Sequence, residues 1–117
     1  MSENSIARFK SLQFAKRVVK LYQYLNTTHK EFVMSKQILR SGTSIGANIS
    51  EAIYGSSRKD FAAKLEIAQK ETAETLYWLE LLNSTGYIPE RLYDSLRSDC
   101  CEIMAILIST IKKCQDK

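Results

Sequence analysis

Turn-forming residues are scarce in this chain, which has one proline and four glycines among 117 residues. A turn-rich β protein needs many more of them, and no window of the sequence alternates apolar and polar residues with period two. No apolar run approaches the roughly 20 residues of a membrane span. The first ten residues, MSENSIARFK, lack the apolar core of a signal peptide. We therefore expect an all-α, cytoplasmic protein with no membrane partner.

Side chains for nucleophilic or metal chemistry are also few. They are one histidine and three cysteines: His29, Cys100, Cys101 and Cys114. The cysteines fall within one helical pattern, where we expect small core hydrophobes in a reducing compartment. A di-iron carboxylate bundle requires Glu-x-x-His pairs, but no histidine follows Glu71 or Glu74 at that spacing. We therefore predict no catalytic residue, no metal site and no cofactor.

Positive charge is concentrated in the first half of the sequence. Residues 1–59 carry ten Lys and Arg against three acids, whereas residues 60–117 carry seven against ten. A basic surface of this kind suits a polyanion such as RNA or DNA, although a solvated helix face carries similar charges. The candidate phosphate contacts are Arg8, Lys10, Lys16, Arg17, Lys20, Lys36 and Arg40.

Hydrophobic periodicity predicts four helices. The first should span residues 6–25 and bury a stripe of Leu12, Ala15, Val18, Val19, Tyr22 and Leu25. Thr28 and Glu31 have the spacing of a capping box, which predicts the start of a second helix that ends near Tyr54. Short connections between amphipathic helices indicate an antiparallel up-down-up-down four-helix bundle that occupies residues 1–117 as one domain.

Capping signals bound the last two helices. Ser57, with Asp60 three residues later, predicts the N-terminus of a third helix. Gly86 suits a left-handed position after the end of that helix. Pro89 suits the first turn of the fourth helix.

The fourth helix contains a run, residues 103–108, that is apolar on every side. One side of this run fills the bundle core, so we predict that its other side contacts a second subunit. The predicted interface residues are Ile103, Met104, Ile106 and Ile108.

The segment from Arg40 to Glu51, RSGTSIGANISE, departs from an ordinary helix in two ways. Gly42 and Gly46 stand in mid-helix, where each costs roughly 1 kcal/mol relative to alanine. A polar stripe also runs beside its apolar face and is expected to meet the third helix. The predicted network contains Ser44, Asn48, Glu51, Lys64, Glu71 and Glu74. Three roles stay open: a bond network that fixes helix register, a ligand or phosphate contact, and a polar seam between subunits.

Four sequence blocks carry a family resemblance. They are residues 37–51, 57–61, 70–79 and 86–88, which read QILRSGTSIGANISE, SRKDF, KETAETLYWL and GYI. In this order and spacing, the chain resembles the bacterial four-helix-bundle family of 23S ribosomal RNA intervening-sequence proteins. The resemblance implies ring-like homo-oligomers, typically pentamers, without enzymatic activity. A related group, the accessory variability determinants of diversity-generating retroelements, forms a basic pentameric barrel that binds nucleic acid and a reverse transcriptase.

Two functional hypotheses follow. The first is a non-catalytic homo-oligomer, pentameric by resemblance, that binds structured RNA or DNA through its basic first two helices. The second is a protein-interaction scaffold, or an adaptor for a mobile-element enzyme such as a reverse transcriptase, in which the charges only keep the assembly soluble. The salt dependence of binding separates the two, because phosphate contacts release counterions.

Overall fold

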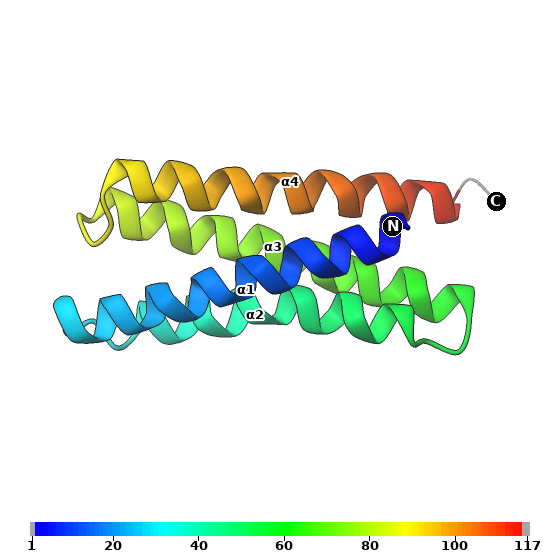
Figure 1. The fold of residues 1–117 in the computed structure, drawn as a ribbon, viewed down its shortest axis with the longest axis horizontal. Coiled ribbons are helices and arrows are strands. Elements are labelled where there is room, and N and C mark those ends of the chain that lie inside the picture. Colours follow the sequence, from blue (N-terminus) through cyan, green and yellow to red (C-terminus); the bar gives the residue numbers. More distant parts are fainter. Residues whose placement is uncertain (1, 116–117) are drawn as a thin grey trace.

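The computed structural model describes residues 2–115 and contains four helices, drawn in Figure 1. They are α1 (Glu3–Thr28), α2 (Met34–Ile53), α3 (Arg58–Ser84) and α4 (Glu90–Gln115). Each helix packs against its neighbours in the cyclic order α1–α2–α3–α4, and successive helices run antiparallel. The predicted all-α, up-down-up-down four-helix bundle is thus confirmed. Residues 1, 116 and 117 of the predicted domain lie outside the described residues.

The bundle is elongated, with dimensions of 47 × 23 × 21 Å. Because successive helices are antiparallel and their number is even, the start of α1 and the end of α4 lie at the same end of the bundle (Figure 1). α1 crosses the bundle obliquely, with its N-terminal part beside α4 and its C-terminal part beside α2. Near the C-terminal part of α1, a hollow opens between α1 and α4.

The boundaries of the last two helices follow the predicted capping signals closely. The Ser57 hydroxyl accepts a hydrogen bond from the backbone N–H of Asp60 at 3.0 Å. Gly86 has a φ of +84°, the left-handed conformation that a residue without Cβ adopts at little cost. Pro89 stands immediately before α4 rather than in its first turn, and its carbonyl accepts from the Tyr93 N–H at 3.0 Å.

The α1–α2 connection differs from the prediction. α1 continues to Thr28, so the predicted N-terminal capping role of this threonine was wrong. Glu31 caps α2 without a threonine partner, because its carboxylate reaches forward to the backbone. It accepts hydrogen bonds at 3.2, 3.1 and 2.8 Å from the N–H groups of Val33, Met34 and Ser35. A negative charge at this position also favours the positive end of the α2 dipole.

The buried face of α1 is rotated from the predicted stripe. Leu12 and Val19 are 43% and 39% exposed, whereas Phe14 is fully buried. The residues that α1 places in the core are Ala7, Ser11, Phe14, Val18, Leu21 and Leu25. α1 carries apolar side chains on two faces, and periodicity alone does not say which face meets the other helices. The prediction was right for Val18 and Leu25 and wrong for Leu12 and Val19.

Gly42 and Gly46 allow α1 and α2 to pack closely. A methyl group at Gly42 would lie 2.8 and 2.9 Å from the two Cγ atoms of Val18, which is tighter than van der Waals contact. A methyl group at Gly46 would lie 3.2 Å from the hydroxyl oxygen of Ser11. The two glycines therefore form successive contact points along the antiparallel α1–α2 seam. Close helix approach accounts for their presence in mid-helix.

Candidate functional site

A charged cluster joins α2 to α3. Arg40 contacts two carboxylates of α3: its Nη2 lies 2.5 Å from Glu74 Oε2, and its Nη1 lies 3.3 Å from Glu71 Oε2. The indole N–H of Trp78 donates to the same Glu74 oxygen at 3.0 Å. Glu71, Glu74 and Trp78 are positions i, i+3 and i+7, which share one face of a helix, so both acids reach Arg40 and the indole reaches Glu74. Arg40, a candidate phosphate contact, is thus bound to acids of the predicted polar network.

Hydrogen bonds hold the charges of this cluster in place. The bond from Trp78, followed by the bond from Arg40, lowers the pKa of Glu74. The bond to Glu74 is the main cause that raises the pKa of Arg40. The cluster is therefore suited to fixing two helices against each other.

Ser44 and Asn48 bond within their own helix. The Ser44 hydroxyl donates to the Arg40 carbonyl at 2.7 Å, and Asn48 Nδ2 donates to the Ser44 carbonyl at 2.8 Å. Glu51 does reach α3, where its carboxylate forms an ion pair with Lys64 at 3.2 Å. The predicted network is thus not continuous. Glu71 and Glu74 bind Arg40, Glu51 pairs with Lys64, and the other two side chains bind the α2 backbone.

Asn48→Leu should change the free energy of unfolding by less than about 1 kcal/mol. The Ser44 carbonyl that accepts from the Asn48 side chain lies within α2 and keeps its helical N–H donor, so no buried group loses its last partner. Urea unfolding at fixed protein concentration measures the change. A loss above about 2 kcal/mol would mean that Asn48 has a partner outside its own helix, such as a second subunit.

Acids pair with three of the seven candidate phosphate contacts. Lys10 and Arg17 of α1 form ion pairs of 3.2 and 2.7 Å with Glu102 and Asp99 of α4. Arg40 binds α3 as described above. Among the side chains that the structure describes, no carboxylate lies within ion-pair distance of the other four, Arg8, Lys16, Lys20 and Lys36. Of the seven candidates, these four are therefore available to an external anion.

The predicted subunit interface on α4 needs a correction. Ile103 is 1% exposed and belongs to the core, so the prediction that it contacts a second subunit was wrong. Met104 and Ile106 are half-buried, and Ile108 is 49% exposed. Sequence reasoning missed a second exposed apolar surface, which α1 forms with Phe9, Leu12 and Val19. The signal for it was present, since these residues recur at helical spacing on a side of α1 that the core does not use.

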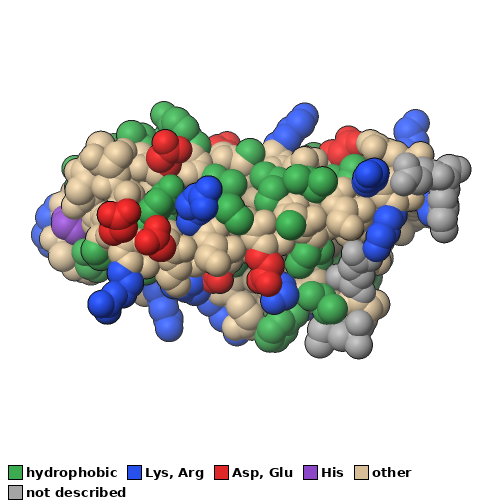
Figure 2. Space-filling model, turned by 90° about the horizontal axis from the view of Figure 1, so that it is seen from above, with side chains coloured by type: hydrophobic (Ala, Val, Ile, Leu, Met, Phe, Trp, Pro, Cys, Tyr) green, Lys and Arg blue, Asp and Glu red, His purple; other side chains and the backbone are tan. Residues whose placement is uncertain are grey.

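Apolar and charged side chains share the face that Figure 2 shows, which is seen from the α4 side. Hydrophobic side chains gather along the middle of this face, with basic and acidic side chains around and between them. A face of this composition combines an apolar contact area with a charged rim, as many protein interaction sites do.

Cys100 is a core residue with an unreactive thiol. Burial, with smaller effects of Cys101 and Asp99, raises the pKa of Cys100 to about 12, so the thiol stays protonated at neutral pH. No three His, Cys, Asp or Glu side chains within residues 2–115 are grouped to hold a metal ion. In the same part of the chain, no helix combines the length and the apolar character that crossing a membrane demands.

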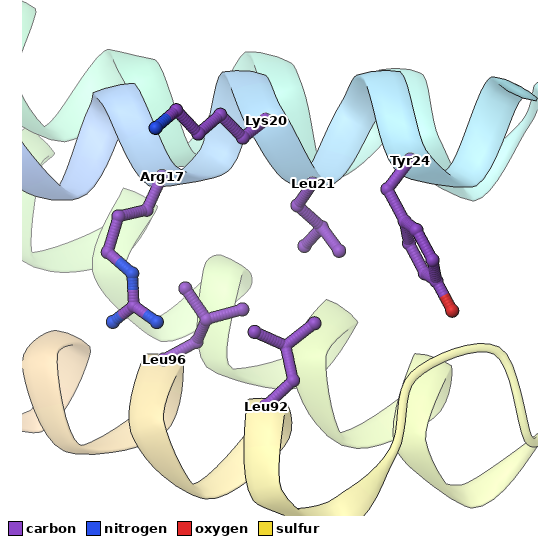
Figure 3. Close-up of a pocket in the computed structure, with 6 residues that line it drawn as sticks. All are labelled: Arg17, Lys20, Leu21, Tyr24, Leu92 and Leu96. Atoms are coloured by element: carbon purple, nitrogen blue, oxygen red, sulfur yellow. The ribbon is translucent and has the colours of Figure 1, made fainter. Parts of the chain in front are cut away.

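A hollow of about 380 Å³ lies between α1 and α4, and Figure 3 shows its lining. The side chains that line it are Arg17, Lys20, Leu21, Tyr24, Leu92 and Leu96. The three leucines among these residues carried no functional prediction. The hollow results from the oblique course of α1, which no local pattern in the sequence expresses.

The fold and its surface define an antiparallel four-helix-bundle protein in which several cations of α1 and α2 have no acidic partner among the described side chains. The family model of the 23S rRNA-intervening sequence protein matches residues 3–109, and the chain belongs to this family. The resemblance found in the sequence is confirmed. The chain is also similar to a crystal structure of a protein of unknown function from the S23 ribosomal protein family of Bacteroides thetaiotaomicron. The two share 57% sequence identity and a TM-score of 0.93, over 95% of this chain and 99% of the other. No curated protein matches the chain.

Proposed function

We propose that this chain is a non-catalytic, homo-oligomeric protein that binds RNA or DNA through the cations of α1 and α2. One observation carries the proposal: positive charge on these helices exceeds what the acids of α3 and α4 neutralise. Four cations remain without an acidic partner among the described side chains: Arg8, Lys16, Lys20 and Lys36. Cations of this kind supply most of the affinity of proteins for phosphate backbones.

Self-association multiplies this charge. A ring of five copies, the number that the family resemblance implies, presents the same cations five times, and multivalent contact raises affinity without any new residue. Exposed apolar side chains support contact between copies, because burying them against another subunit removes apolar area from water. The exposed side chains on α1 and α4 are Phe9, Leu12, Val19 and Ile108.

Charge reversal on α1 tests the proposed nucleic-acid surface. The triple variant Arg8→Glu, Lys16→Glu, Lys20→Glu should bind a structured RNA and a DNA duplex more weakly than the wild type. For duplex DNA, the slope of log K against log salt concentration should fall by about 0.9 for each phosphate contact that is lost. Fluorescence anisotropy between about 50 and 200 mM salt measures both quantities.

A matched triple variant controls for net charge. Lys70→Glu, Arg97→Glu, Lys112→Glu makes the same change in charge at exposed positions of α3 and α4. This variant should keep most of the salt slope. Equal losses in the two triple variants would show that net charge governs binding, and would overturn the assignment to α1. If the wild type binds neither nucleic acid at about 50 mM salt, the protein-interaction scaffold becomes the better account.

A further inference from the structure

The hollow between α1 and α4 has two chemically different ends (Figure 3). Arg17 and Lys20 lie toward one end, and the aromatic ring of Tyr24 forms the other. Between them, three leucine side chains point into the hollow from both helices: Leu21 from α1, and Leu92 and Leu96 from α4. Leu21 and Leu96 are 4% and 1% exposed, so the aliphatic surface that the hollow offers is mainly that of the half-buried Leu92. The hollow thus combines positive charge, aliphatic surface and an aromatic ring.

Hydrogen bonds fix both ends of the hollow. Arg17 bridges the two helices, because its Nη1 pairs with Asp99 at 2.7 Å and its Nη2 donates to Ser95 Oγ at 2.9 Å. The hydroxyl of Tyr24 lies 3.1 Å from His29 Nε2, which anchors the ring to the α1–α2 connection. Lys20, in contrast, has no acidic partner among the described side chains, so its ammonium group is available to a ligand.

We infer that this hollow binds one unpaired nucleotide of a single-stranded RNA or DNA segment, with its base against Tyr24 and Leu92 and its phosphate at Lys20. The inference rests on the proposed nucleic-acid function and adds the strandedness of the ligand. A nucleobase is flat and packs on aromatic and apolar side chains. The volume of the hollow lies within the roughly 300–1,000 Å³ that is usual for small-ligand sites.

The lining also indicates how selective the site is. The three leucines carry no hydrogen-bonding groups, and the Tyr24 hydroxyl is already engaged by His29. Contacts of this kind hold a base by its face and do not read its edge, so we expect weak sequence preference.

Lys16 adds a second phosphate contact for a bound nucleic-acid strand. It is exposed and precedes Lys20 by one helical turn, about 6 Å along α1. Neither lysine forms an ion pair with a described side chain. A strand with one base in the hollow can therefore place neighbouring phosphates along α1. A duplex cannot insert a base without unpairing and unstacking it, which costs free energy.

Replacement of Tyr24 separates the binding of single strands from that of duplexes. We expect Tyr24→Leu to weaken binding of a labelled oligoadenylate RNA by about tenfold, the loss of one base–aromatic stack. Binding of a blunt-ended RNA duplex should change less than about twofold, because its paired bases do not enter the hollow. Tyr77→Leu is the matched control, since this tyrosine is 57% exposed on α3 and does not line the hollow.

A second variant keeps the test valid if Tyr24→Leu disturbs folding. Leu92→Glu places a carboxylate in the hollow, where it repels a phosphate, and does not alter Tyr24 or His29, so it should weaken oligoadenylate binding to a similar extent. If both variants bind oligoadenylate as tightly as Tyr77→Leu does, the inference is overturned, while binding of the RNA duplex still supports the proposed function. If the wild type binds neither oligoadenylate nor an RNA or DNA duplex, the proposed function and the inference both fail.

Discussion

Replacing Gly42 with valine should destabilise the bundle by about 2–3 kcal/mol. Even a single methyl group at this position would come within 2.9 Å of both Cγ atoms of Val18. Val18 is fully buried and, being β-branched, has little rotamer freedom with which to move away. Valine and glycine differ little in helix propensity, so the expected loss reports packing between α1 and α2. Urea unfolding at fixed protein concentration measures it.

Two variants make this test specific. Ala47→Val introduces the same residue at an exposed position of α2 and should cost less than about 1 kcal/mol, because only helix propensity changes. The double variant Val18→Ala, Gly42→Val should be more stable than the sum of its single effects predicts, since the smaller alanine makes room for the valine. If Gly42→Val costs no more than Ala47→Val, the two helices do not need the close approach.

The second large effect is expected for Ile103→Ala, which should lower the free energy of unfolding by about 2–5 kcal/mol. This side chain is 1% exposed within a single copy of the bundle, so its removal leaves a cavity in the core. The loss should depend little on protein concentration. Urea unfolding at two protein concentrations tests both statements.

Ile108→Ala is the control on the same helix. Ile108 is 49% exposed, so its truncation should change the stability of one subunit by no more than about 0.5 kcal/mol. If it lies between copies, its effect should grow with protein concentration, because association stabilises only the assembled state. If Ile103→Ala separates subunits that remain folded, the core assignment of Ile103 would be contradicted.

The sequence correctly predicted the features of the fold that depend on residues close to one another in the chain. Helical periodicity indicated four antiparallel helices, and Ser57 and Gly86 stand where their capping roles require. The rotation of α1 was harder to predict, because Phe14 and Leu12 are equally apolar and only contact with the other helices decides which is buried. For the same reason, a wholly apolar run did not reveal that Ile103 faces inward.

The candidate site needed information from distant parts of the chain. The cations of α1 and α2 were evident from composition, but their ion pairs with Asp99 and Glu102 depend on how α1 crosses α4. The hollow combines residues 17–24 with residues 92–96, and its existence depends on the tilt of α1. The pairing of these two distant segments and the tilt of α1 do not produce any periodic pattern in the sequence. Residue types therefore indicated the chemistry, whereas only the fold shows which of these groups are free.

The even number of antiparallel helices has a practical consequence for handling the protein. The start of α1 and the end of α4 share one end of the bundle, whereas Tyr24 lies in the last part of α1, toward the opposite end. An affinity tag, a fluorophore or a surface linker attached at either terminus is therefore far from the hollow. Immobilised protein should present the hollow to solution with either attachment, so the two attachments should give the same affinity in binding measurements.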